Sequence, residues 1–269
     1  MLAITVLILN LVVISSCDHK VLSQELIDFI NSLNTTWKAG HNFPGWDEKH
    51  LHRLCGVLEG DVKLPLLEIK PFNAIPSSFD SRYQWPNCPT IREIYNQGNC
   101  GSRWAVSSAH AMSDRYCTAF RTQVSISAQD LLTCCSSCGN GCDGGYSADA
   151  WKYWVNYGIV TGGSYGSNKG CQPYEYAPSD CFDCHSKWTF NCDRTCRRTY
   201  PVKYKNDKHY GSTYYHVPFT VSKIQTEIMT NGPVTASFDV YKDFYSYRSG
   251  VYQHTYGSKN GGHAMKIIG

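Results

Sequence analysis

Apolar residues fill the start of the chain from Met1 to Ile14, and three small residues, 15–17, follow before polar residues begin. The run is shorter than the roughly 18 to 20 apolar residues that a membrane-spanning helix needs. A short apolar run that ends in small residues is typical of a cleaved secretory signal. We therefore expect a signal peptide over residues 1–17, with a membrane anchor as the alternative, and no membrane attachment after cleavage.

Between Leu22 and about Lys38 apolar residues recur with a spacing near 3.6, which predicts a helix with one apolar face. This segment includes Asn34-Thr35-Thr36, a sequon for N-glycosylation. From about Glu59 to Pro76 three prolines interrupt the chain without a clear period, which indicates a linker or a cleavable joint. A separate helical segment therefore precedes the main domain.

Helical patterns come first in the main domain. Residues 102–116 place apolar side chains on one face, which predicts a helix that begins at Ser102 or Arg103 with Ser102 as N-cap. Shorter helices are expected over 148–157 and 224–230. Alternating or continuous apolar residues then predict strands over 234–240, 250–256 and 263–268. Helices followed by strands indicate an α+β fold with two lobes.

Composition and charge narrow the function. Apolar residues make up 42% of the chain, which is enough for a buried core. The net charge of +3 is spread along the chain, and the only dense basic cluster lies among cysteines, at Arg194, Arg197 and Arg198. Nucleic-acid-binding proteins carry a basic face, so we expect no nucleic acid as partner. The ten histidines would gain charge in an acidic compartment such as a lysosome.

Fourteen cysteines in a secreted chain should mostly form disulfides, because the secretory route is oxidising. Zinc is the alternative, because the spacings Cys135-x-x-Cys138, Cys181-x-x-Cys184 and Cys192-x-x-x-Cys196 resemble those of metal ligands. The cysteine density of a secreted chain favours disulfides. We therefore expect neither a metal nor another cofactor.

Several long motifs, in order, resemble one family. Residues 97–105, QGNCGSRWA, resemble the active-site segment of papain-like cysteine peptidases, in which glutamine precedes Cys-Gly-Ser-Cys-Trp-Ala. The segment LSQELIDFINSLNTTWKAGHNF from Leu22 is similar to the cathepsin B propeptide, and IPSSFDSRYQWPNCPTI from Ile75 is similar to the mature amino terminus. Three further segments complete the match: DLLTCCSSCGNGCDGGY, NDKHYGSTYY and SGVYQHTYGSKNGGHAMKIIG.

The resemblance implies a papain-like fold with a helical left lobe and a β-rich right lobe, preceded by a helical propeptide. It places the propeptide at residues 18–75 and a cathepsin B-type peptidase domain at 76–269. The right lobe is expected to be incomplete, because the chain stops at Gly269, before the asparagine that orients the family's histidine. The resemblance also implies six disulfides: Cys88 with Cys117, Cys100 with Cys142, Cys134 with Cys192, Cys135 with Cys138, Cys171 with Cys196 and Cys181 with Cys184.

This chain has the family's site residues at the matching positions, with one exception. In these enzymes a cysteine thiolate at a helix start attacks the peptide carbonyl, with a histidine as its partner. Here Arg103 stands at the nucleophile position, His263 matches the histidine, and Gln97 matches the donor to the oxyanion. A guanidinium stays protonated and is no nucleophile. The substrate backbone is expected at four glycines: Gly101, Gly144, Gly145 and Gly262.

Two consequences follow from these departures. The family's occluding loop, with its pair of histidines, shrinks to the segment Cys181–Cys184 followed by His185 alone, so an active ancestor would have been an endopeptidase. Arg103 beside a helix start and Gln97 favours anions, such as a peptide's C-terminal carboxylate. The alternative is that Arg103 points into solvent or pairs with a nearby acid.

We therefore expect a secreted or lysosomal cathepsin B-like homologue that is catalytically inactive and binds peptides. Its expected partners are peptides, protein substrates or inhibitors in the cleft, and its own propeptide. Two alternatives remain open. One is an active papain-family cysteine endopeptidase, if Arg103 and the end at Gly269 are sequence errors. The other is a non-functional fragment.

Overall fold

The computed structural model describes residues 19–58, 60, 63–178 and 188–269. The expected signal peptide and the expected pair Cys181–Cys184 lie outside the described residues. The chain forms two compact units. The first comprises Met1–Phe43 with Asp243–Tyr256, and the second comprises Pro44–Lys242 with Gly257–Gly269.

The first unit joins a helix to a small sheet. Helix α1, Gln24–Ser32, begins where the Ser23 hydroxyl accepts a hydrogen bond from the Leu26 amide, and its buried face packs on Trp37. The helix predicted to continue to Lys38 ends early, because Asn34 takes a left-handed conformation with φ 49°. The next residues form β1, Trp37–Ala39, which pairs antiparallel with β3, Tyr247–Gly250.

The strand predicted over residues 250–256 is also wrong. Strand β3 ends at Gly250, which has a φ of 95° that favours glycine and turns the chain away from the ladder. The next segment is held by Asp243 instead, whose carboxylate accepts hydrogen bonds from the Thr255 and Tyr256 amides at 2.7 and 2.9 Å. Aromatic residues in this segment therefore pack around a buried acid rather than along a strand.

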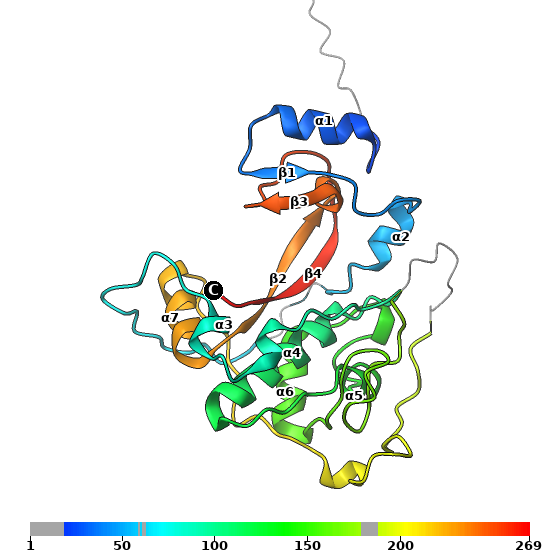
Figure 1. Ribbon diagram of the computed structural model, residues 1–269, viewed down its shortest axis with the longest axis vertical. Coiled ribbons are helices and arrows are strands. Elements are labelled where there is room, and N and C mark those ends of the chain that lie inside the picture. Colours follow the sequence, from blue (N-terminus) through cyan, green and yellow to red (C-terminus); the bar gives the residue numbers. More distant parts are fainter. Residues whose placement is uncertain (1–18, 59, 61–62, 179–187) are drawn as a thin grey trace, which may run out of the picture. The chain divides into compact units, whose positions relative to one another are not determined.

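Helix α4, Arg103–Phe120, is the buried centre of the second unit (Figure 1). It begins where the sequence predicts, but the Ser102 side chain does not cap it and bonds to the Tyr174 hydroxyl instead. Helices α5, Ala128–Cys134, and α6, Ser147–Tyr157, pack against α4. The unit also contains three further α-helices: α2, Glu48–Arg53, α3, Ser81–Gln84, and α7, Val221–Asn231.

The second sheet of the described chain also has two strands. Strand β2, Val234–Tyr241, pairs antiparallel with β4, Lys259–Ile267, and Phe238 lies opposite His263 in this register. The strands predicted over 234–240 and 263–268 are therefore present, and the second one begins earlier. Strand β4 also contacts α4, which brings the histidine strand to the start of the central helix.

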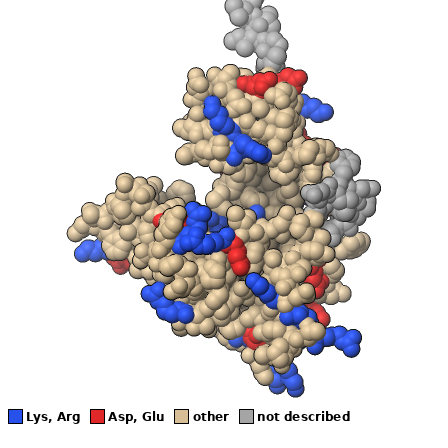
Figure 2. All heavy atoms as spheres, in the orientation of Figure 1, with Lys and Arg blue, Asp and Glu red and all other residues tan. Residues whose placement is uncertain are grey.

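Short 3-10 helices complete the regular structure: η1, Pro89–Arg92, η2, Gly141–Asp143, η3, Tyr204–Asn206, and η4, Lys242–Ser246. Among the described residues five disulfides are formed, and they are five of the six pairings that the family resemblance implies: Cys88–Cys117, Cys100–Cys142, Cys134–Cys192, Cys135–Cys138 and Cys171–Cys196. On the face shown in Figure 2, Lys and Arg form small separate groups with Asp and Glu nearby, rather than one continuous basic surface.

Candidate functional site

Arg103 and His263 meet across the second unit. Arg103 is the first residue of α4, and His263 lies on β4. The Arg103 Nε donates a hydrogen bond to His263 Nε2 at 3.3 Å, and Arg103 Nη1 donates to the Tyr95 carbonyl at 3.3 Å. The guanidinium therefore points neither into open solvent nor onto an acid of the described chain. Its partner is instead the imidazole of His263, to which it donates a hydrogen bond.

The electrostatics of the pair make His263 neutral. Burial, and after it the Arg103 charge, lower the pKa of His263, and a hydrogen bond to the Leu54 backbone opposes both, so that the pKa is about 4. Burial also lowers the pKa of Arg103, but a guanidinium keeps its proton at any physiological pH. Above about pH 4 the imidazole is therefore a hydrogen-bond acceptor for a fixed cation.

Gln97 lies beside the pair in the loop that leads into α4. Its Nε2 donates to the Leu54 carbonyl at 3.1 Å and to the Cys100 carbonyl at 2.7 Å. The disulfide Cys100–Cys142 and a hydrogen bond from the Gly101 amide to the Cys142 carbonyl at 2.9 Å hold this loop. The Gln97 amide therefore already binds a backbone oxygen that arrives from another part of the chain.

That oxygen belongs to a segment, Leu54–Leu58, that crosses the site. The Val57 amide donates to the Gly262 carbonyl at 3.2 Å, and the Leu58 amide donates to the Gly145 carbonyl at 3.1 Å. The Gly145 amide in turn donates to the Gly56 carbonyl at 3.1 Å. The chain's own backbone thus occupies two of the glycines at which the sequence analysis expects substrate.

The other two glycines have different surroundings. Gly144 has a φ of 111°, and a Cβ there would lie 3.1 Å from the Leu58 side chain, so it also borders the crossing segment. A Cβ on Gly101 would lie 2.4 Å from the Cys142 carbonyl, so Gly101 is needed for close packing of the loop. A Cβ on Gly56 would in turn lie 1.8 Å from the Gly101 carbonyl. The crossing segment therefore fits against the loop only because Gly56 has no side chain where it contacts the backbone of Gly101.

Sequence reasoning missed this segment and the Tyr95 carbonyl. The contacts of residues 54–58 join positions far apart along the chain, and no local period marks them. The Tyr95 contact is made by a backbone carbonyl, which every residue type carries. The close approach at Gly56 is the one feature with a sequence signal, because only glycine lacks a Cβ.

Lys266 and Asp114 join the strand to the helix behind the site. Lys266 Nζ on β4 lies 2.7 Å from Asp114 Oδ2 on α4 and also donates to the Thr90 carbonyl. The Asp114 side chain is fully buried, so this pair fixes β4 against α4 rather than serving a ligand at the surface. It keeps His263 and Arg103 on facing elements.

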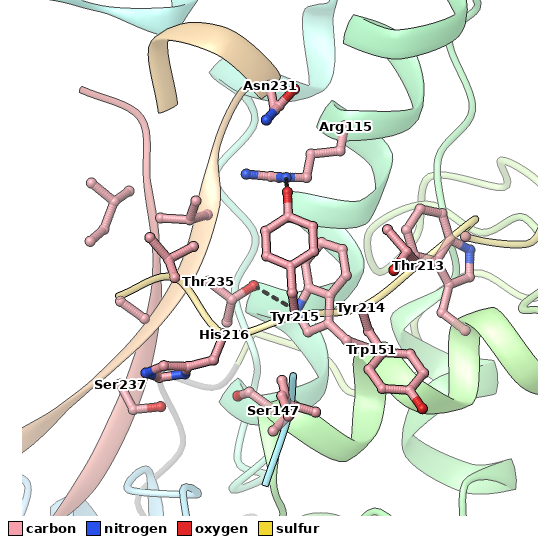
Figure 3. Close-up of a pocket in the computed structure, with 18 of the residues that line it drawn as sticks. Arg115, Ser147, Trp151, Thr213, Tyr214, Tyr215, His216, Asn231, Thr235 and Ser237 are labelled. Carbon is pink, nitrogen blue, oxygen red and sulfur yellow. Dashed lines mark hydrogen bonds between the residues drawn. The ribbon is translucent and has the colours of Figure 1, made fainter. Parts of the chain in front are cut away.

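A separate cavity of about 840 Å³ lies between α4, α6, β2 and residues 210–219 (Figure 3). Figure 3 shows Arg115 and Tyr215 pointing toward one another, and the Arg115 Nη1 donates to the Tyr215 hydroxyl at 2.8 Å. The Trp151 Nε1 donates to Thr235 Oγ1 at 3.3 Å across the same space. Val57 and Leu58 of the crossing segment also line it.

Within the described ranges, no three His, Cys, Asp or Glu side chains are grouped to hold a metal ion. None of the helices in the described part of the chain is long and apolar enough to cross a membrane.

Comparisons with known proteins identify the family of the chain. Residues 75–269 match the papain family cysteine protease family, and residues 22–61 match the peptidase family C1 propeptide. The chain is 46% identical over 266 residues to the cathepsin B-like cysteine proteinase 5 of Caenorhabditis elegans, covering 91% of this chain and 76% of that protein. It is 43% identical over 253 residues to the gut-specific cysteine proteinase of the same organism, with the same coverage of each.

A solved structure supports the fold directly. The proCathepsin B S9 from Trypanosoma congolense has a TM-score of 0.81 and 39% identity, over 93% of this chain and 83% of that one. Residues 54–58, which cross the Arg103 site, lie within the segment 22–61 that matches the peptidase family C1 propeptide. The chain therefore belongs to the papain family of cysteine proteases, and it has cathepsin B-like homologues in that family.

Proposed function

We propose that this protein is a papain-family homologue that binds peptides and does not cleave them. One observation carries the proposal: the Arg103 guanidinium lies 3.3 Å from His263 Nε2, where the family resemblance expects a thiolate and its imidazole. Cysteine peptidases need that thiolate to form an acyl-enzyme, and the partner imidazole to activate it. Arg103 offers no electron pair, and it uses the acceptor nitrogen of His263 for its own hydrogen bond.

The two described cysteines nearest the site, Cys55 and Cys100, do not replace the missing thiol. Cys100, three residues before Arg103 in the chain, forms a disulfide with Cys142. Cys55 is a thiol, but it belongs to the crossing segment, next to Gly261. It would leave the site together with that segment. Peptide binding is supported by the backbone groups of Gly145 and Gly262, which already hold an extended chain without using any side chain.

Thiol-directed labelling tests the loss of activity. The chain is incubated with a cathepsin-type alkylating probe and with peptide substrates, and labelled residues are mapped by mass spectrometry. We expect no cleavage and no label at the site apart from Cys55, and a Cys55→Ser variant removes that background. Arg103→Cys is the matched variant, in which label at residue 103 shows that the probe enters. Probe-sensitive peptide cleavage by the unaltered chain would instead identify an active cysteine endopeptidase.

The compartment forms part of the same proposal. Five disulfides join described cysteines of the second unit, and such bonds form in the secretory route rather than in the cytosol. We propose a secreted or lysosomal protein whose first partner is its own propeptide. Non-reducing gels of the protein from its native source test this, and fully reduced cysteines would contradict it.

A further inference from the structure

The Arg103 site already holds an oxygen atom. The Leu54 carbonyl accepts a hydrogen bond from Gln97 Nε2 at 3.1 Å, and the Leu54 backbone is also hydrogen-bonded to His263. Gln97 itself is buried. A buried amide donor aimed at a backbone oxygen, next to a cation, is an arrangement that recognises acceptors.

The charge of the site is not balanced by the described chain. Arg103 donates to a neutral imidazole and to the Tyr95 carbonyl, and no acid of the described residues forms an ion pair with it. Its remaining nitrogen, Nη2, makes no hydrogen bond to the described residues. A mostly buried cation without a counter-charge is unfavourable, and an anionic ligand relieves that cost.

We propose that Arg103 and Gln97 bind the C-terminal carboxylate of a peptide, at the place now taken by the Leu54 carbonyl. This rests on the proposed function, because it requires a peptide that stays uncleaved. A carboxylate offers a second oxygen and a negative charge that a backbone carbonyl lacks. The preceding residues lie along Gly145, whose amide and carbonyl now hold Gly56 and Leu58.

The neighbouring backbone favours a peptide over a small free anion. Gly145 and Gly262 supply donors and acceptors at the spacing of an extended chain, which an isolated ion does not use. The cavity of about 840 Å³ is lined by Val57 and Leu58, so a peptide that replaces this segment brings apolar side chains to the same space. The ligand is therefore the cleaved end of a polypeptide with apolar residues before its carboxylate.

The crossing segment must leave before such a peptide binds. Gly56→Ala achieves this in the full chain, because the new Cβ would lie 1.8 Å from the Gly101 carbonyl, a backbone atom held by its disulfide-linked loop. Faster tryptic cleavage after Arg53 reports that residues 54–58 have been released. All binding measurements then use this variant as the parent.

Titration calorimetry compares Ac-Ala-Val-Leu-Ala with a free carboxylate and the same peptide with a carboxamide end, and acetate alone serves as a third ligand. We expect the carboxylate form to bind about tenfold more tightly than the amide, the size of one charge-assisted hydrogen bond. Arg103→Gln should abolish the preference and Arg103→Lys should keep part of it. Arg121→Gln, an exposed arginine beyond the other end of α4, should leave it unchanged.

Each outcome decides one question. Equal affinity for both peptides, or a preference that survives Arg103→Gln, overturns the carboxylate site and leaves uncleaved peptide binding in place. Equal binding of acetate and of the carboxylate peptide overturns the peptide part. No binding of any ligand overturns both the site and peptide binding, whereas the labelling experiment judges activity separately.

A second measurement covers the case in which Gly56→Ala does not fold. In the unaltered chain a ligand that displaces residues 54–58 accelerates tryptic cleavage after Arg53. The carboxylate peptide should accelerate this cleavage more than its amide at equal concentration, and Arg103→Gln should remove the difference. Identical rates with both peptides would overturn the proposal.

Discussion

Two arginines of helix α4 have opposite surroundings. Arg115 uses every nitrogen of its guanidinium: Nε donates to the Pro233 carbonyl, Nη1 to the Tyr215 hydroxyl and Nη2 to Glu227 Oε1, at 2.7, 2.8 and 2.8 Å. Arg103 donates to one neutral ring and one carbonyl, both at 3.3 Å. The same residue type on the same helix thus forms an ion pair in one place and only hydrogen bonds to neutral groups in the other.

The difference separates a structural group from a binding group. Glu227 is fully buried and has Arg115 as its counter-ion, so the pair holds α7 against α4. Arg103 has no acidic partner among the described residues, and its neighbours Gln97 and His263 carry no negative charge that could neutralise it. Arg115, whose counter-ion belongs to the fold, should therefore contribute to the stability of the protein. Arg103, which lacks a counter-ion in the described chain, should contribute to the binding of a ligand.

The largest expected effect follows from removing the complete partner. Arg115→Leu leaves the Glu227 carboxylate buried without its cation, and such a loss costs about 3 kcal/mol of unfolding free energy. Arg103→Gln should lower the unfolding free energy by less than about 1 kcal/mol, because it removes a cation that pairs with no acid of the described chain. Urea unfolding of the two variants measures both values, and equal losses would erase the contrast between the arginines.

A double variant serves as the control for that measurement. Arg115→Leu combined with Glu227→Leu removes both charges, so it should lose less stability than Arg115→Leu alone. If the double variant is the less stable of the two, packing rather than charge explains the loss at Arg115.

An intermediate effect is expected from Gly56→Ala. The added methyl group would overlap the Gly101 backbone, and overpacking of this kind costs about 1–3 kcal/mol. Gly40→Ala is the matched control, because a Cβ there would lie at an ordinary 3.6 Å from the Arg248 side chain. Thermal unfolding compares the two variants, and a similar decrease in Tm for both would show that the fit at Gly56 is not tight.

A smaller effect concerns the titration of His263. Burial is the main cause of its low pKa of about 4, and the Arg103 charge is the second. Arg103→Gln should therefore raise the pKa of His263 while leaving it below the usual value of about 6.5. NMR titration of the ring protons measures it, with Arg121→Gln as control. An unchanged pKa would mean that burial alone sets it.

The smallest effect is on stability against pH. Since the folded pKa of His263 lies below its unfolded value, the unfolded chain binds a proton first as the pH falls. The contribution of His263 is thus complete above about pH 6.5 and is lost as the pH falls to about 4. Urea midpoints across this range should fall less steeply in Arg103→Gln than in the unaltered chain, and parallel curves would contradict the coupling.

Much of the fold could be predicted from the sequence because its patterns are local. The start of α4 at Arg103 and the strands around Val234 and His263 follow from apolar spacing over a few residues. The helix expected to reach Lys38 failed because the left-handed turn at Asn34 overrides a continuing apolar spacing. The segment after Gly250 failed because Asp243, a buried acid, organises it from outside the pattern.

The site was predictable in its members but not in its contacts. The motifs around Gln97, Arg103 and His263 identify them as one site, and the structure brings them together. The sequence could not decide whether Arg103 faces solvent, an acid or an anion, because the answer depends on groups that are distant along the chain and close in space. No spacing along the chain encodes that the Leu54 carbonyl and the Tyr95 carbonyl lie there.

The distribution of the disulfides has a consequence for how the second unit opens. The last cysteine in the sequence is Cys196, so no covalent link reaches α7, β2 or β4. The loops closed between Cys88 and Cys196 restrict the unfolded chain, whereas the strand that carries His263 is restrained only by hydrogen bonds, packing and ion pairs. In hydrogen–deuterium exchange, amides of β2 and β4 should therefore lose protection before those of α4, and the histidine should part from the arginine while the helices are still folded.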